Sequence, residues 1–364
     1  MKERTKNIIV LLLTGVVIFG FALLGLLMPD GDISLSERRP LKQPPKLSAD
    51  AILSGDYTAD FEEYAADQFP LRDTFRRIKA YAVYYLFRQG DNNGVYLQDG
   101  YASKLEYPLN EDSIQRAAQV FKKVYDKYLT ESRVYLSIIP DKNAFMAESG
   151  GYPAIDYARF VEMMTQSAPF MEYIPIDHLL ELEDYYRTDT HWRQERIVDV
   201  AAHLGEAMGA ELKGEYNEAA LDKPFYGVYC GQAALPLPAE TLYYLTNDTL
   251  EGCSVYDHET GRHIGVYDLE KAGGQDPYEI FLSGSKSLLT IKNPACDNGK
   301  ELIVFRDSFG SSIVPLLVEG YSAVTVVDIR YISSDMLGRF VDFHGQDVLF
   351  LYSTLVLNNS VTLK

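Results

Sequence analysis

An apolar run near the start of the chain constrains its structure most. Residues 8–28, IIVLLLTGVVIFGFALLGLLM, contain no charged side chain. At about 1.5 Å of rise per residue, a helix of this length crosses a hydrocarbon core of about 30 Å. Three basic residues lie within residues 1–7, whereas the segment PDGD that follows the run is acidic. Since basic flanks stay on the cytoplasmic side, we expect residues 1–7 in the cytoplasm and the rest of the chain outside it.

A cleaved signal peptide is the alternative to an anchor. Such a peptide has a shorter apolar core and ends on small residues at the cleavage site. Leu26, Leu27 and Met28 at the end of this run do not match such a site. The sequence therefore favours a single-pass, uncleaved anchor in the cell membrane, followed by an extracytoplasmic domain.

The composition is that of a folded, acidic protein. Of 364 residues, 47% are hydrophobic and 24% are charged, and the formal net charge is −18. A field of this sign repels phosphate backbones, so we expect no nucleic-acid partner. The three cysteines have no metal-ligand spacing, and we expect neither a metal nor another cofactor. The cysteines are either buried thiols or, outside the cytoplasm, Cys230 and Cys253 pair and Cys296 stays free.

The chain after the apolar run divides into a tether and a domain. Residues 29–50 are polar and contain prolines, which is typical of a tether. Residues 51–364 are expected to form the extracytoplasmic domain. Apolar residues at helical spacing predict helices over residues 51–90, with a break at Pro70, and over residues 111–128.

Short apolar runs in the domain predict buried parallel strands. These runs are too short for helices, rich in branched side chains and interspersed with helical stretches, and they cover residues 133–139, 301–305, 323–327 and 347–352. Such alternation predicts an α/β fold with a mostly parallel sheet. Residues 223–292 instead contain short segments divided by Gly, Pro, Asn and Asp, namely GVYCG, TLYYL, CSVYD and HIGVYD. We read these segments as strands and expect a β-rich insertion there.

Ser308 occupies a position that suits a nucleophile. The strand ELIVF runs into Arg306-Asp307-Ser308-Phe309-Gly310, so Ser308 falls at a strand-to-helix turn. Ligands of open α/β sheets bind at the carboxyl ends of the strands, and the free N–H groups of a helix start stabilise an oxyanion there. The alternative is that Ser308 or Asp307 only caps the helix.

The segment Asp189-Thr190-His191-Trp192 supplies a candidate base. Residues two apart in an extended segment point the same way, so the Asp189 carboxylate can orient one imidazole nitrogen of His191 while the other faces outward. The alternative is a surface loop with an incidental histidine. With Ser308, the pair makes a nucleophile, a base and an orienting carboxylate. The single tryptophan of the chain, Trp192, lies beside the base.

The order Asp189, His191, Ser308 resembles that of the DHHW family, within the SGNH-hydrolase-like superfamily that includes the alginate O-acetylation proteins. Further segments match in the family's order, from residue 61 to residue 352: FEEYAADQFPLRDTFRR, SIIPDKNAF, DTHWRQE, DPYEIFLSG, IVFRDSF, VVDIRYI and QDVLFLY. The resemblance implies an SGNH-hydrolase-like, flavodoxin-like core with a permuted order of catalytic blocks. It assigns Ser308 as the nucleophile, His191 as the base and Asp189 as the carboxylate that orients His191.

The same resemblance points to residues around the substrate. Thr190 stands where the family name has His, and Arg306 replaces the Gly that opens the GDS block elsewhere. Gly284 and Ser285 stand where many relatives have Gly-Asn, an oxyanion element. Further candidates for substrate or oxyanion contact are Lys142, Arg330, Tyr331 and Trp192. For Lys142, Arg330 and Tyr331, the alternative role is packing and ion pairing at strand ends.

The function implied by the resemblance is O-acyl transfer, most simply of acetyl, to an exported or cell-surface polysaccharide. Ser308 takes the acyl group, and a sugar hydroxyl attacks the acyl-enzyme with His191 as base. Soluble acyl-CoA is not expected outside the membrane, so the resemblance implies a membrane-bound O-acyltransferase as the partner that relays the acyl group. Two alternatives stay open: a carbohydrate acetylesterase with the same triad, and a non-catalytic glycan-binding or assembly protein whose 27 tyrosines supply stacking surfaces.

Overall fold

The computed structural model describes residues 3–364, which divide into two compact units. The N-terminal unit comprises the chain up to Asn92 together with Gly231–Pro236. The main unit comprises Asn93–Cys230 and Leu237–Lys364. We expected the folded domain to begin at residue 51, whereas the boundary between the compact units lies at residues 92 and 93.

The N-terminal unit is mostly helical. Within residues 3–364, α1 is the single helix that is long and apolar enough to cross a membrane. The helical structure is interrupted at residues 68–71, between α3 and α4, which agrees with the helix break expected at Pro70. The elements of this unit are α1 (Glu3–Leu27), β1 (Ile33–Ser34), β2 (Arg39–Pro40), α2 (Ala49–Ser54), α3 (Asp56–Asp67), α4 (Arg72–Tyr81), the π-helical turn η1 (Ala82–Leu86) and β3 (Asp91–Asn92).

The main unit alternates strands and helices. Its strands are β4 (Val95–Gln98), β5 (Tyr101–Lys104), β6 (Val134–Ile139), β7 (Glu172–Tyr173), β8 (Asn217–Ala220), β9 (Tyr243–Thr246), β10 (Ser254–Asp257), β11 (Arg262–Ile264), β12 (Leu288–Lys292), β13 (Glu301–Arg306), β14 (Ala323–Val327) and β15 (Asp347–Ser353). Its α-helices are α5 (Glu111–Val124), α6 (Asn143–Gly150), α7 (Tyr157–Ser167), α8 (Val198–Ala207), α10 (Asp248–Gly252), α11 (Gly310–Leu317) and α12 (Thr354–Leu357); α9 (Val228–Ala233) begins here. Nine short turns complete it: η2 (Tyr125–Leu129), η3 (Asp177–Leu179), η4 (Leu182–Asp184), η5 (Gln194–Arg196), η6 (Leu269–Gly273), η7 (Pro277–Ile280), η8 (Val318–Gly320), η9 (Ser334–Arg339) and η10 (Ser360–Thr362).

An eight-stranded sheet in the order β11-β10-β12-β14-β13-β15-β6-β7 organises the main unit. The pairs from β14 to β7 are parallel, and the three pairs from β11 to β14 are antiparallel. This architecture confirms the predicted α/β class with a mostly parallel sheet. Strands β10, β11 and β12 of the expected β-rich insertion thus belong to the main sheet, and GVYCG, expected as a strand, lies mostly in helix α9.

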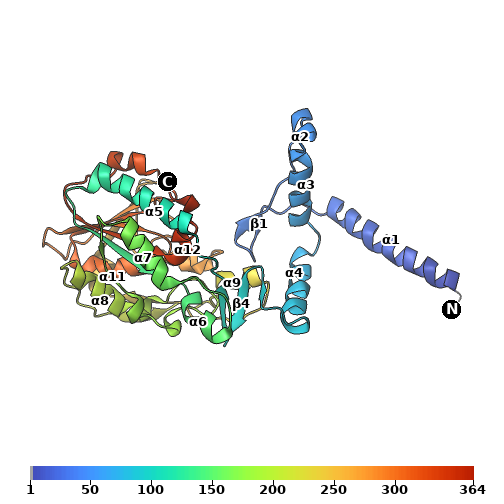
Figure 1. The fold of residues 1–364 in the computed structure, drawn as a ribbon, viewed down its shortest axis with the longest axis horizontal. Coiled ribbons are helices and arrows are strands. Elements are labelled where there is room, and N and C mark those ends of the chain that lie inside the picture. Colours follow the sequence, from blue (N-terminus) through green and yellow to red (C-terminus); the bar gives the residue numbers. More distant parts are fainter. Residues whose placement is uncertain (1–2) are drawn as a thin grey trace. The chain divides into compact units, whose positions relative to one another are not determined.

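Helices cover both faces of the sheet (Figure 1). Alternate residues of each strand point to opposite faces, and the buried side chains accordingly form two clusters. One cluster packs the strands against α8 and α11, and the other packs them against α5 and α7. In β13, for example, Val304 faces the first cluster, and Ile303 and Phe305 face the second.

The parallel strands β14, β13, β15 and β6 end at one edge of the sheet. Four polar residues follow or complete these strands there: Asp328, Ser308, Ser353 and Asp141. This edge is where an open α/β sheet binds its ligands. The same strands carry their apolar residues in the core, so the edge is backed by a rigid sheet.

Cys253 is buried in the first of these clusters and carries a free thiol. The pairing of Cys230 with Cys253, which the sequence left open, is therefore not formed in this structure.

Candidate active site

The turn that carries Ser308 is fixed by the side chain of Asp307. Ser308 lies between the end of β13 and the start of α11. One carboxylate oxygen of Asp307 accepts the Phe309 N–H at 3.0 Å, and the other accepts the N–H and the hydroxyl of Ser353 at 2.8 and 2.6 Å. Asp307 is fully buried. A buried carboxylate with three donors thus ties the turn to the neighbouring strand β15.

Three side chains form a continuous hydrogen-bonded chain at this turn. Ser308 Oγ lies 2.8 Å from His191 Nε2, and His191 Nδ1 lies 2.6 Å from Asp189 Oδ1. Asp189 is 1% exposed and His191 7%, whereas Ser308 is partly exposed. The hydroxyl is therefore the end of the chain that a solute reaches first. A ring nitrogen at this distance from a hydroxyl can take its proton.

The Asp189 carboxylate accepts two backbone N–H groups in addition to the imidazole. Oδ1 accepts the His191 N–H at 3.1 Å, and Oδ2 accepts the Val228 N–H at 2.8 Å. The chain at Gly227 lies so close that a Cβ there would be 2.2 Å from the carbonyl carbon and oxygen of Thr188. The Gly227 N–H donates to Thr188 Oγ1 at 2.9 Å. Glycine is therefore required at residue 227 for this segment to reach the carboxylate.

Glu240 clamps the backbone that leads into Asp189. Its Oε1 accepts the Arg187 N–H at 2.7 Å. Its Oε2 accepts the N–H and the hydroxyl of Thr188 at 2.7 and 2.6 Å. Bonds from neutral donors to a carboxylate are stronger than bonds between neutral groups. Glu240 therefore fixes the position from which the Asp189 side chain starts.

The His191 ring is stacked on the ring of Tyr278. The ring centroids lie 3.9 Å apart with an interplanar angle of 7°. The Tyr278 hydroxyl donates to Ser312 Oγ at 2.7 Å, which fixes the phenol on helix α11. Burial raises the pKa of Tyr278 well above its ordinary value, so this phenol stays neutral. A neutral aromatic face of this kind can stabilise an imidazolium stacked on it.

Trp192 lies in the core and not at a substrate surface. It is fully buried, and its indole N–H donates to the Phe309 carbonyl at 3.1 Å and to Ser312 Oγ at 2.9 Å. Neighbouring residues of an extended segment point to opposite sides, so a His191 that faces Ser308 sends Trp192 inward. This placement corrects the expectation that Trp192 contacts a substrate. Trp192 instead joins the segment that carries His191 to the turn that carries Ser308.

Lys142 is also buried, at 1% exposed. Its Nζ donates to the carbonyls of Tyr186 and Arg187 at 2.8 and 3.3 Å and lies 4.8 Å from the centre of the Tyr229 ring. Burial lowers the pKa of Lys142 to about 7. The expected contact with a substrate or oxyanion is thus replaced by a contact with the backbone that precedes Asp189.

Gly284 belongs to a turn that Arg306 holds. The turn has positive φ angles of 51°, 57° and 82° at Leu282, Ser283 and Gly284. Side chains other than glycine rarely adopt this conformation, and it marks local backbone strain. The buried Arg306 donates to the Gly284 carbonyl at 3.2 Å and pairs with Asp328 at 3.4 Å. Burial lowers the pKa of Arg306. The strained turn is therefore anchored to the last residue of β13, two positions before Ser308.

Ser285, Arg330 and Tyr331 differ in exposure, and the Arg330 side chain is only 17% exposed. Ser285 is exposed, and Tyr331 is 51% exposed. Arg330 binds Asp328 through two nitrogens at 2.9 and 2.7 Å, and its guanidinium lies 5.5 Å from the centre of the Tyr331 ring. Asp328 therefore forms ion pairs with both Arg306 and Arg330. A substrate contact for these three residues stays a proposal.

The sequence reasoning missed Glu240, Tyr278 and Gly227. Tyr278 lies within DPYEIFLSG, one of the segments on which the family resemblance rests, so that segment carried a signal. Glu240 and Gly227 lie in a stretch with no such signal. Within residues 3–364, no group of three or more His, Cys, Asp or Glu side chains is arranged to hold a metal ion.

The main unit has an α/β fold in which the carboxyl ends of a mostly parallel sheet carry the turn with Ser308. No family model and no curated protein matches the chain. Among solved structures, a DHHW family protein from Eubacterium siraeum is similar with a TM-score of 0.61 and 20% identity over 73% of this chain and 93% of the other. Bacillus cereus PatB1 with a sulfonyl adduct is similar with a TM-score of 0.58 and 17% identity over 72% of this chain and 97% of PatB1. The O-acetyltransferase domain of Pseudomonas putida AlgJ has a TM-score of 0.47 and 15% identity, over 73% of this chain and 92% of that domain. The first likeness confirms the resemblance to a DHHW family protein at the level of the fold, and the second shows that PatB1 has a similar fold.

Proposed function

We propose that this chain is a serine acyl-transfer enzyme that moves an acyl group, most simply acetyl, onto a hydroxyl of a cell-surface or exported polysaccharide. The observation that carries the proposal is the unbroken chain from Ser308 Oγ through His191 to Asp189, with distances of 2.8 and 2.6 Å. A serine that only caps a helix needs neither a histidine nor a buried carboxylate behind it.

The first half-reaction acylates the serine. His191 Nε2 takes the Ser308 proton while Oγ bonds to the carbonyl carbon of the donor ester. The tetrahedral intermediate collapses, and the leaving alkoxide departs with that proton from the imidazolium. Asp189 holds the imidazolium through Nδ1–H, and Tyr278 faces it. The Ser308 N–H has no hydrogen-bond partner among residues 3–364, so it is available to the oxyanion.

The second half-reaction passes the acyl group to the acceptor. A sugar hydroxyl attacks the acyl carbonyl carbon, His191 takes the hydroxyl proton, and Ser308 leaves with that proton. If water takes the place of the sugar, the same steps make the chain an esterase. The sulfonyl adduct borne by PatB1, which shares the fold, supports a reactive nucleophile in this fold. Sulfonyl groups bond to activated serines, so the same reagent class suits this chain.

We propose further that α1 anchors the enzyme in the cell membrane with its main unit outside the cytoplasm. The length and apolar composition of α1 support this placement. Since no soluble acyl-CoA is expected outside the membrane, a membrane-bound O-acyltransferase would relay the acyl group to Ser308. The anchor keeps the main unit beside the membrane that contains that partner.

Mass spectrometry of the full chain after exposure to an activated acetyl ester tests the nucleophile. We expect an acetyl adduct on Ser308 that is absent in Ser308→Ala and His191→Ala. The acceptor is then tested by incubating the acetylated enzyme with an oligosaccharide. Acetylated sugar supports the transferase, and free acetate alone supports the esterase. If wild type shows neither an adduct nor ester turnover, the proposal gives way to a glycan-binding or assembly role.

A further inference from the structure

Helix α4 and the turn η1 expose a broad apolar face in the N-terminal unit. The members of this face, each between 44% and 73% exposed, are Leu71, Phe75, Ile78, Tyr81, Tyr85, Leu86 and Phe87. The opposite side of the same helix holds the buried Ala80 and Val83. A contiguous apolar face on a folded unit marks a binding surface for another apolar phase.

The start of this face packs against α1. The ring of Phe21 in α1 lies 5.4 Å from the ring of Phe69 and 5.6 Å from the ring of Phe75. Phe69 and Phe75 also contact each other at 5.8 Å. One turn further along α1, Gly25 has no side chain, and a Cβ there would meet Pro70 at 3.8 Å. Residues 68–71, which form an elbow between α3 and α4, therefore pack against the last turns of α1.

The position of Phe21 along α1 sets the depth of the elbow. Leu27, the last residue of α1, lies six residues further, which is about 9 Å at ~1.5 Å per residue. If α1 spans a membrane, Phe21 lies below the outer boundary of the hydrocarbon by about that distance. Side chains in ring contact with Phe21 then lie at the depth of about 5–10 Å at which interfacial helices bury their apolar face.

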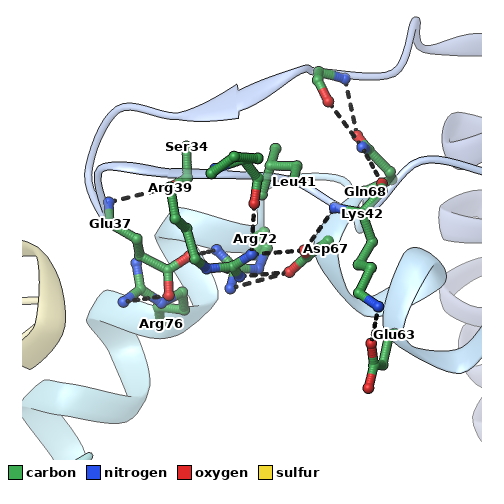
Figure 2. Close-up of polar contacts among 12 residues, drawn as sticks. Ser34, Glu37, Arg39, Leu41, Lys42, Glu63, Asp67, Gln68, Arg72 and Arg76 are labelled. Atoms are coloured by element: carbon green, nitrogen blue, oxygen red, sulfur yellow. Dashed lines mark hydrogen bonds and ion pairs between the residues drawn. The ribbon is translucent and has the colours of Figure 1, made fainter. Parts of the chain in front are cut away.

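A polar network fixes the elbow to the segment that leaves α1 (Figure 2). Arg39 holds Asp67 through two hydrogen bonds of 2.8 and 2.6 Å, and these bonds keep the pKa of Asp67 at about 2. Gln68 exchanges two bonds of 2.9 Å with the backbone of Gly31. Arg72 pairs with Glu37. The apolar face is thus presented by a braced element and not by a loose linker.

The charges along α4 and η1 also fit a membrane surface. Residues 72–88 contain five basic residues and one acidic residue, in a chain whose net charge is −18, and two of the five, Arg72 and Arg76, pair with Glu37 in the network above. Basic residues beside an apolar helical face are typical of segments that lie in the headgroup region. The neighbouring helix α3 is acidic instead, with five Asp and Glu residues over Asp56–Asp67.

We infer that the α3–α4 elbow is a second membrane contact, in which the apolar face of α4 and η1 lies in the outer leaflet beside α1. The inference rests on the proposed anchoring by α1 and goes beyond the proposed acyl transfer. The occupant of the face is the headgroup and upper acyl region of a lipid bilayer. The elbow then holds the N-terminal unit at the membrane surface, where α1 alone supplies a single point of attachment.

Tryptophan quenching in liposomes tests this contact with the full chain. Ile78→Trp and Leu86→Trp place a reporter on the face, and the exposed Glu62→Trp on acidic α3 is the matched control. The native Trp192 is fully buried in the main unit and supplies a constant background. Each variant is reconstituted in phosphatidylcholine vesicles with and without bromine on the upper acyl chain.

We expect the bromolipid to quench the added tryptophan at residues 78 and 86 at least about twofold more than at residue 62. Equal quenching at all three positions, or none above the Trp192 background in protein that floats with the vesicles, overturns the inference. Protein that fails to float overturns the anchor as well. Acetylation of Ser308, measured on the same vesicles, reports the proposed function independently of these outcomes.

Discussion

Replacing Glu240 by glutamine tests whether the hydrogen bonds of Glu240 to the residues before Asp189, called the clamp below, contribute to catalysis. The carboxylate accepts one bond from Arg187 and two from Thr188, at 2.6 to 2.7 Å. A glutamine side chain has one oxygen and one NH2 group. With the NH2 facing Arg187 one bond is lost, and with it facing Thr188 two are lost. The remaining bonds lose the charge that strengthened them.

The magnitude follows from these counts. A hydrogen bond to a charged group contributes about 1.5–3 kcal/mol. Glu240 is only partly buried, so the lower part of that range applies. We therefore expect Glu240→Gln to lower the free energy of unfolding by about 2 kcal/mol. A shift of the Asp189 backbone also loosens the imidazole, and we expect the rate of Ser308 acylation to fall ~10-fold, which is about 1.4 kcal/mol.

Two measurements separate the structural effect from the catalytic one. Urea unfolding gives the stability, and the burst of chromophore from an activated acetyl ester gives the acylation rate. Glu251→Gln, an exposed residue of α10, is the matched control and should change neither. A variant at residue 240 that is less stable but acylates at the wild-type rate would refute the reasoning that this clamp orients Asp189.

Three further predictions concern the same edge of the sheet. Gly227→Ala places a Cβ 2.2 Å from the Thr188 backbone, so it should displace the Val228 N–H from Asp189. In the same two assays, we expect a larger loss in the rate of Ser308 acylation than in the free energy of unfolding. Asp189→Asn keeps the shape but not the charge, and we expect acylation to fall ~10³–10⁴-fold with little change in circular dichroism; wild-type acylation would contradict the orienting role. Burial raises the pKa of Asp141 from 3.8 to about 6, so between these values the folded state holds a proton that the unfolded chain has released. Stability should therefore fall as pH rises through this range, by up to about 3 kcal/mol, and urea unfolding of Asp141→Asn should lack this slope.

The sequence alone determined the features that depend on local patterns. Apolar runs of strand length located β6, β13, β14 and β15 to within one residue at each end. The run at residues 8–28 predicted the membrane-length helix α1. A serine directly after a buried strand and an aspartate two residues before a histidine are also local patterns. These two patterns predict the two halves of the candidate site, and the structure gives the distance between them.

Some side chains were placed wrongly because the sequence does not show which way a residue faces. Trp192 was expected at the substrate, yet the alternation of an extended segment sends it inward once His191 faces Ser308. Lys142 was expected there too, yet its ammonium is held by two backbone carbonyls. Only the fold decides which residues of a strand end point to solvent.

The tertiary structure decided everything that joins distant parts of the chain. His191 and Ser308 are separated by 117 residues, and their contact exists because the segment with His191 packs on the turn with Ser308 through Tyr278 and Trp192. Glu240 is one of 52 acidic residues, and no local pattern sets it apart from the others. The physical reason is that strand and helix propensities act over a few residues, whereas a hydrogen bond depends on where the whole sheet and its loops bring two atoms.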